Sequence, residues 1–135
     1  MLKYLENQEI AKAKNILYTE IVGPRQVGKS NIIRMIAEGN SKLGTNVLVI
    51  FPNNHFRSID SYIGIFEEAA LSISQLPHVT VTTYESKKHH IVGNSYKVVL
   101  LDECGHEPEY NKFIRDLLIK TNGPLQIISF NSIGS

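Results

Sequence analysis

The residues best suited to chemistry form one short stretch, residues 23–30, which read GPRQVGKS. The spacing G-x-x-x-x-G-K-[ST] is typical of a phosphate-binding loop, because its glycines let successive backbone N–H groups point at phosphate oxygens. An ordinary glycine-rich turn is the alternative, although chance gives this match in well under about one chain in a hundred of this length. We expect ATP to contact Gly23, Pro24, Arg25, Gln26, Val27, Gly28, Lys29, Ser30 and Asn31.

We expect specific roles for two side chains of this stretch, and a third side chain has two alternative roles. Lys29 would reach the β- and γ-phosphates and take part in catalysis, and the Ser30 hydroxyl would bind Mg²⁺. Arg25 could neutralise charge in the transition state, or it could equally pair with a surface acid.

An acidic pair follows the most strand-like run of the chain, residues 98–101 (VVLL). Mg²⁺ is a hard cation that needs a carboxylate nearby, and Asp102 at the tip of a buried strand would supply it. Glu103 would then orient or deprotonate the water that attacks the γ-phosphate. The alternative is that both residues are acidic only because the strand end meets solvent.

Polar residues also end the last predicted strand. In a parallel sheet the ligand lies beyond the carboxyl ends of the strands, so Asn131 or Ser129 would contact the γ-phosphate or the attacking water. Strand-end asparagine is also ordinary turn chemistry, and the two interpretations have about even weight.

Three other groups of residues give weaker signals for a functional site. The basic cluster at residues 87–90 (KKHH) could contact a nucleic-acid backbone, but a solvated loop is the favoured interpretation. Cys104 and His106 are two potential metal ligands without partners, which do not make a site. Tyr110 and Phe113 fit the buried face of a helix better than a stacking platform.

The hydrophobic pattern around these residues alternates between short β-rich runs and amphipathic stretches, which is typical of an α/β domain with a largely parallel sheet. Strands are predicted at residues 16–22, 47–51, 79–83, 98–101 and 125–130, and a polar loop or hairpin at residues 85–94. Helices are predicted at residues 2–14, from Ser30 to a left-handed stop at Gly39 and Asn40, from Asp60 or Ser61 through Ile73, and from Tyr110 through Leu118. The phosphate-binding stretch would thus join a strand to a helix, as the motif requires.

Composition limits the class of protein. The 135 residues, 42% hydrophobic and 20% charged, predict a single globular domain at residues 1–135. The net charge of +1 gives no global attraction to nucleic acid or membrane. A single cysteine and the lack of an apolar run near 18 residues predict a soluble cytoplasmic protein with no membrane partner.

Several of these sequence motifs resemble those of P-loop NTPases of the class that has an extra catalytic glutamate. Within that class, residues 25–30 (RQVGKS), 47–52 (VLVIFP), 92–93 (VG) before the acidic pair, and 128–131 (ISFN) resemble the ATPase domain of phage terminase large subunits. The resemblance implies a three-layer α/β/α fold and Mg²⁺-dependent ATP hydrolysis. It also implies a viral DNA-packaging motor in the host cytoplasm, which acts on double-stranded DNA as a homo-oligomer or with packaging and nuclease subunits.

A second family competes with this one. The phosphate loop of one AAA-type family of prokaryotic ATPases also reads GPRQVGK, with a proline five residues after the acidic Glu, as Pro108 is here. That resemblance implies a regulatory ATPase, and a nucleotide-binding module without turnover is a third alternative. A terminase carries a nuclease domain after its ATPase, so we expect either a fragment or a stand-alone ATPase that needs other chains.

Overall fold

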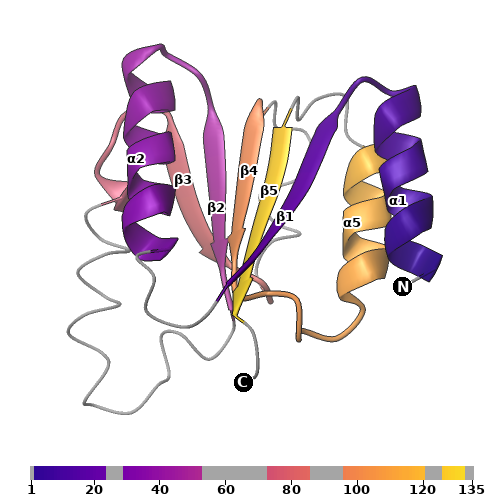
Figure 1. The fold of residues 1–135 in the computed structure, drawn as a ribbon. Helices are drawn as coiled ribbons and strands as arrows, with labels where there is room; N and C mark the ends of the chain where they lie inside the picture. Colours follow the sequence, from indigo (N-terminus) through magenta and orange to yellow (C-terminus); the bar gives the residue numbers. More distant parts are fainter. Residues whose placement is uncertain (1, 24–28, 53–72, 86–95, 121–125, 133–135) are drawn as a thin grey trace.

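A five-stranded parallel sheet forms the centre of the molecule (Figure 1). The computed structural model describes residues 2–23, 29–52, 73–85, 96–120 and 126–132. The strand order is β1-β5-β4-β2-β3, and every neighbouring pair in the described ranges runs parallel. The strands are β1 (Leu17–Gly23), β2 (Val47–Phe51), β3 (Val79–Thr83), β4 (Val98–Asp102) and β5 (Gln126–Ser132). The predicted α/β class with a largely parallel sheet is confirmed.

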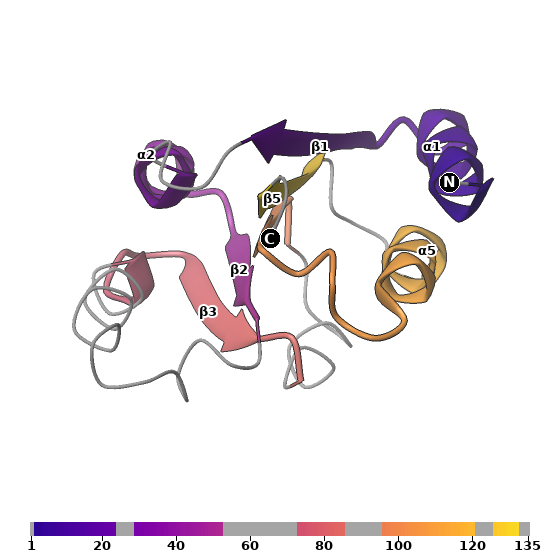
Figure 2. The same cartoon turned by 60° about the horizontal axis from the view of Figure 1, so that its bottom comes forward.

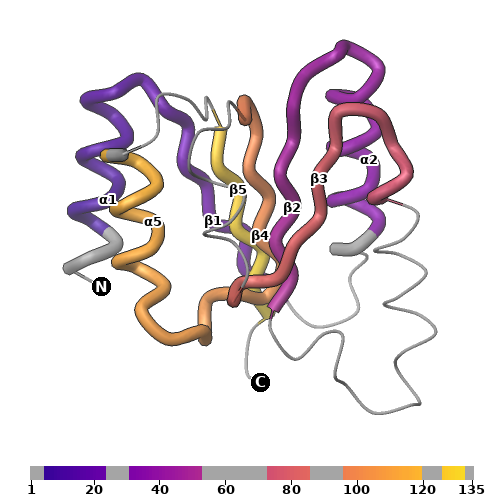
Figure 3. Tube along the Cα trace, turned by 180° about the vertical axis from the view of Figure 1, so that it is seen from behind, coloured from indigo at the N-terminus to yellow at the C-terminus, as the bar shows by residue number. Residues whose placement is uncertain are grey.

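Helices cover both faces of this sheet. Helix α2 (Lys29–Lys42) lies on one face, whereas α1 (Leu2–Ala13) and α5 (Tyr110–Lys120) lie on the other (Figure 2). Seen from behind, α1 and α5 run side by side (Figure 3), and the Asn7 amide joins them by donating to the Asn111 carbonyl at 3.1 Å. Parallel strands covered on both faces need apolar residues at every position, as β2 shows in its fully buried sequence VLVIF.

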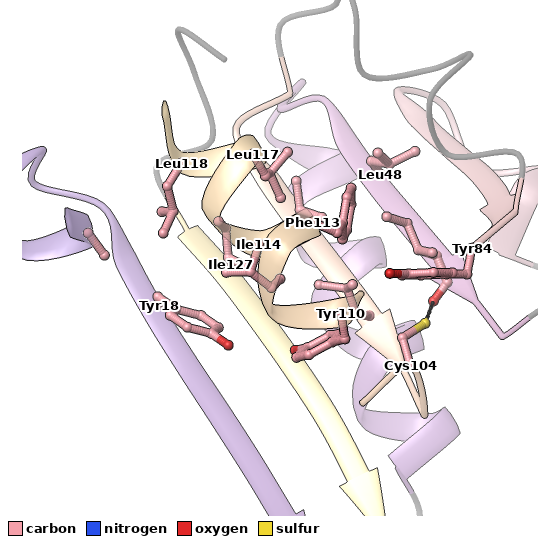
Figure 4. Close-up of a cluster of buried hydrophobic side chains, with 14 residues drawn as sticks. Tyr18, Leu48, Tyr84, Cys104, Tyr110, Phe113, Ile114, Leu117, Leu118 and Ile127 are labelled. Atoms are coloured by element: carbon pink, nitrogen blue, oxygen red, sulfur yellow. Dashed lines mark hydrogen bonds between the residues drawn. The ribbon is translucent and has the colours of Figure 1, made fainter. Parts of the chain in front are cut away.

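Side chains alternate along each strand, so the core has two halves. The half beneath α1 and α5 includes Tyr110 and Phe113, which confirms their predicted place on the buried face of a helix (Figure 4). Its other main members are Tyr18, Leu48, Ile50, Val99, Leu101, Cys104, Ile114, Leu117, Leu118 and Ile127. The half beneath α2 is formed by Ile33, Ala37, Val47, Val49, Phe51, Ile73, Val79, Val98, Leu100, Ile128 and Phe130.

The predicted stop of α2 at Gly39 and Asn40 is wrong, because the helix continues to Lys42. The left-handed residue is Gly44, at φ +74°, and its N–H donates to the Ser41 carbonyl at 3.0 Å. The N–H of the next residue, Thr45, donates to the Asn40 carbonyl at 2.9 Å, which completes a Schellman cap. The helix continues beyond Gly39 because its buried face extends to Ser41. The Ser41 hydroxyl donates to the Pro77 carbonyl at 2.6 Å.

Other predicted boundaries agree within two residues. The last strand continues to Ser132 instead of ending at residue 130, because its backbone pairs with β1 as far as Gly23. The predicted helix from Asp60 or Ser61 lies outside the described residues except near its end, where Ile73 is buried. Most of the predicted loop at residues 85–94 also lies outside them. In the described ranges, every helix is too short or too polar to cross a membrane.

Candidate nucleotide site

The candidate site lies where three neighbouring strands end. Parallel strands bring their carboxyl ends to one edge of the sheet, and here β5 lies between β1 and β4 (Figure 1). In the register of these strands Gly23 is opposite Ser132, and Asp102 is opposite Phe130. The first residue of the phosphate-binding stretch and the acidic pair therefore flank the tip of one strand.

The phosphate-binding stretch has the predicted elements on both sides. Strand β1 ends at Gly23 and helix α2 begins at Lys29, so Lys29 and Ser30 form the first turn of the helix. Asn31, in the same turn, is exposed. The N–H groups of a helix's first turn have no partner within the helix and carry a partial positive charge, which favours a bound anion. The five residues between strand and helix, Pro24, Arg25, Gln26, Val27 and Gly28, lie outside the described residues.

Asp102 is the last residue of β4 and is only 4% exposed. Val98 and Leu100 of the same strand belong to the core beneath α2, so alternation places Asp102 on the face of the sheet that α2 covers. A buried carboxylate on the same face as the helix that carries Ser30 suits a hard cation with oxygen ligands. The described residues contain no cluster of three or more His, Cys, Asp or Glu side chains, and Mg²⁺ needs only one or two carboxylates beside phosphate and water.

Glu103 leaves the sheet in a left-handed conformation, with φ 55°. This conformation is uncommon for residues other than glycine and must be held by the surroundings. The Glu103 N–H donates to the Phe130 carbonyl at 2.7 Å. The side chain returns to the tip of β5, where Oε2 accepts the Ser132 N–H at 3.2 Å and Oε1 accepts the Ser132 hydroxyl. The carboxylate is therefore fixed above β5 next to the end of β1.

Asn131 and Ser129 lie on the opposite face of β5, toward α5. The Asn131 Oδ1 accepts the Gly105 N–H at 3.0 Å, and its Nδ2 donates to Glu20 Oε1 at 3.1 Å and to Ser129 Oγ at 3.3 Å. The Tyr110 hydroxyl donates to Ser129 Oγ at 2.5 Å. In this structure both side chains thus join α5, β1 and the turn after Glu103, and their contact with a γ-phosphate stays a prediction.

Two tyrosines next to this network remain protonated over the ordinary pH range. Burial raises the pKa of Tyr110 to about 12 and is also the main cause that raises the pKa of Tyr84 to about 12. The Tyr84 hydroxyl donates to the Pro108 carbonyl at 2.7 Å. Cys104 is buried near Tyr84 and Tyr110 (Figure 4), whereas His106 is exposed.

Three residues of this region, Ser132, Glu20 and Gly105, were not predicted from the sequence. Ser132 shares the face of α2 with residues 128 and 130 only because the strand continues past residue 130. No local signal identifies Glu20 or Gly105, because each acquires its contact with Asn131 only when distant strands pair.

Beyond the phosphate-binding stretch, two arginines lie exposed on helices. Arg34 Nε lies 3.0 Å from Glu38 Oε1 on the exposed surface of α2, and Arg115 is exposed on α5, across the sheet from α2. Arg57 and the cluster at residues 87–90 lie outside the described residues.

No protein-family model and no curated protein matches this chain. Its function must therefore be inferred from its own residues and their arrangement.

Proposed function

We propose that this chain binds ATP with Mg²⁺ at the carboxyl edge of β1, β5 and β4 and hydrolyses it. One observation carries the proposal: Gly23, the first residue of the phosphate-binding stretch, and Asp102, the first of the acidic pair, flank the same strand tip. The start of α2 lies at the same edge (Figure 1). The arrangement of a parallel sheet between α2 and the pair α1 and α5 supports a three-layer P-loop NTPase fold for the domain at residues 1–135.

Each residue has a defined part in the proposed reaction. Lys29 and the first N–H groups of α2 bind the phosphates, and Ser30 with Asp102 would hold Mg²⁺. When bound, Mg²⁺ neutralises charge on the β- and γ-phosphates. The Glu103 carboxylate takes a proton from water as the water oxygen bonds to the γ-phosphorus. The bond from that phosphorus to the β–γ bridging oxygen breaks, and ADP and inorganic phosphate result.

The larger role that we propose is that of an ATPase in a nucleic-acid motor, such as a viral DNA-packaging motor. It is supported by the resemblance of residues 25–30, 47–52 and 128–131 to terminase ATPase domains. The motor would act on double-stranded DNA as a homo-oligomer or with packaging and nuclease subunits. Arg25 could supply the positive charge that speeds phosphoryl transfer in cis, or Arg34, Arg57 or Arg115 could supply it from a neighbouring subunit.

The proposal is tested by measuring phosphate release from Mg-ATP by the full chain, with and without double-stranded DNA. Turnover that DNA stimulates supports the motor, turnover that DNA leaves unchanged favours the regulatory ATPase, and binding without turnover leaves a nucleotide-binding module. Glu103→Gln should retain Mg-ATP binding and lose turnover, because the amide keeps the shape of the side chain without its basicity.

Glu109→Gln is a matched control for Glu103→Gln. Glu109 is exposed and has a similar left-handed backbone, at φ 58° against 55° for Glu103. The same chemical change there should leave turnover at the level of the unmodified chain. Equal turnover in Glu103→Gln and Glu109→Gln would refute the assignment of Glu103 as the base.

A further inference from the structure

We infer that Ser132 is the positioning residue for Glu103: it holds the carboxylate in the orientation in which it takes a proton from the attacking water. The inference rests on the proposed ATPase function. Its basis is a pair of contacts from one residue, since the Ser132 hydroxyl donates to Oε1 and the Ser132 N–H donates to Oε2 at 3.2 Å. Both carboxylate oxygens are therefore fixed, and the plane of the carboxylate is fixed with them.

The backbone at both Glu103 and Ser132 favours this contact. Glu103 has φ 55°, and its N–H donates to the Phe130 carbonyl at 2.7 Å, so the turn after β4 is held on the backbone of β5. Ser132 is the last residue of β5 and is 8% exposed. Charge-assisted hydrogen bonds to a carboxylate are stronger than neutral ones, and low exposure reduces competition from water. The backbone of β5 and of the turn after β4 therefore positions both residues for this contact, which distinguishes it from a chance contact between two surface side chains.

The position of Ser132 relates the carboxylate to the phosphate-binding stretch. Ser132 is opposite Gly23 in the register of β1 and β5, so one residue borders both the start of the stretch and the proposed base. A general base acts only within hydrogen-bond reach of the proton that it removes. An ionised carboxylate has about four lone-pair sites. Ser132 occupies one of these sites on each oxygen.

Side-chain alternation separates this role from that of Asn131. Ile128 and Phe130 belong to the core beneath α2, so Ser132 lies on that face, whereas Asn131 contacts Gly105 and Glu20 on the other. Ser132 is thus the polar residue at the carboxyl end of β5 on the face that α2 covers.

The test uses steady-state kinetics and ATP affinity of the full chain with Ser132→Ala and Ser132→Thr. Loss of the hydroxyl should lower kcat about tenfold, because general-base catalysis contributes about 10² to 10⁴ and one of its two fixing hydrogen bonds is lost. The KM for ATP should change less than about twofold, and Thr, which keeps the hydroxyl, should restore most of kcat. Ser41→Ala is the matched control, because Ser41 is 9% exposed and donates its hydroxyl to Pro77, far along α2 from the site.

A double-mutant cycle with Glu103→Gln shows whether Ser132 acts through the carboxylate. In the Glu103→Gln background, Ser132→Ala should lower the residual rate by less than about twofold, because the base that it positions is gone. Three results would each overturn the inference without contradicting the proposed ATPase function. The first is that the effects of the two substitutions multiply independently, and the second is a kcat of Ser132→Ala equal to or above that of the unmodified chain. The third is a kcat of Ser132→Thr no higher than that of Ser132→Ala. Absence of turnover in the unmodified chain would instead refute the proposed function, and the inference with it.

Discussion

Replacement of Asn131 by alanine should destabilise the protein strongly, whatever its part in catalysis. The variant loses the acceptor for the Gly105 N–H at 3.0 Å and the donors to Glu20 Oε1 at 3.1 Å and to Ser129 Oγ at 3.3 Å. Asn131 is buried, and its three partners come from the turn after β4, from β1 and from β5 itself. One side chain therefore joins three segments that are distant in the sequence.

The expected cost follows from the partners that remain. A hydrogen bond between neutral groups contributes about 1 kcal/mol, and a buried donor left without an acceptor costs about 1–3 kcal/mol. Three such bonds are lost, and water can replace the amide only in part because Gly105 and Glu20 are both half-buried. The sum is a loss of about 2–4 kcal/mol in the free energy of unfolding. For a domain of this size that lowers Tm by about 10 °C.

Urea unfolding followed by circular dichroism measures this loss, and two further variants make it specific. Asn40→Ala removes one hydrogen bond, to the Ile36 carbonyl at 2.9 Å inside α2. It should change stability by less than about 1 kcal/mol, because alanine has the higher helix propensity. Asn131→Asp keeps an acceptor for Gly105 but places a second carboxylate next to Glu20, so it should be at least as destabilising as Asn131→Ala. A cost below about 1 kcal/mol for Asn131→Ala would refute the view that Asn131 holds these segments together.

Three more outcomes are expected. Lys29→Ala should abolish tight Mg-ATP binding in equilibrium dialysis without lowering Tm, since the proposed partners of Lys29 are phosphates and not a protein carboxylate; equal affinity in both proteins would contradict this. Gly105→Ala should lower the free energy of unfolding by about 1–3 kcal/mol in urea, because the added Cβ would lie 2.7 Å from Asn131 Oδ1. The pKa values of Tyr110 and Tyr84 are raised from 10 to about 12 in the folded state, so stability should be constant up to about pH 10 and fall toward pH 12. Tyr110→Phe should weaken that alkaline loss, and an undiminished loss would count against it.

The sequence predicted the elements of the fold well where the signal is local. The run at residues 98–101 is apolar throughout, as a strand buried on both faces must be, and it forms β4. The strand before the phosphate-binding stretch and the helix after it were also predicted, because the hydrophobic period changes across the stretch. The stop at Gly39 and Asn40 was wrong, because glycine alone does not end a helix whose buried face continues for another turn.

The strand order and the contacts of the site could not be predicted from local pattern. Nothing in residues 126–132 shows that this strand enters between β1 and β4, since that place depends on pairing with segments distant in the sequence. The pairing with β1 extends β5 to Ser132, and only this extension brings Ser132 to the Glu103 carboxylate. The acids were recognisable by type, whereas the residue that orients one of them was not.

Strand β5 holds the turn after β4 from both of its faces. Ser132 fixes the Glu103 side chain on the side of α2, and Asn131 fixes the Gly105 N–H on the side of α5. Only one residue separates Glu103 from Gly105. The left-handed conformation of Glu103 is favourable only while the surroundings hold it. A turn that is released at Gly105 can therefore no longer keep Glu103 in this conformation. Loss of Asn131 should therefore weaken the Ser132 contact as well, and the costs in stability of Asn131→Ala and Ser132→Ala should sum to more than the cost of the double variant. Strict additivity would mean that the two faces of β5 act on the turn independently.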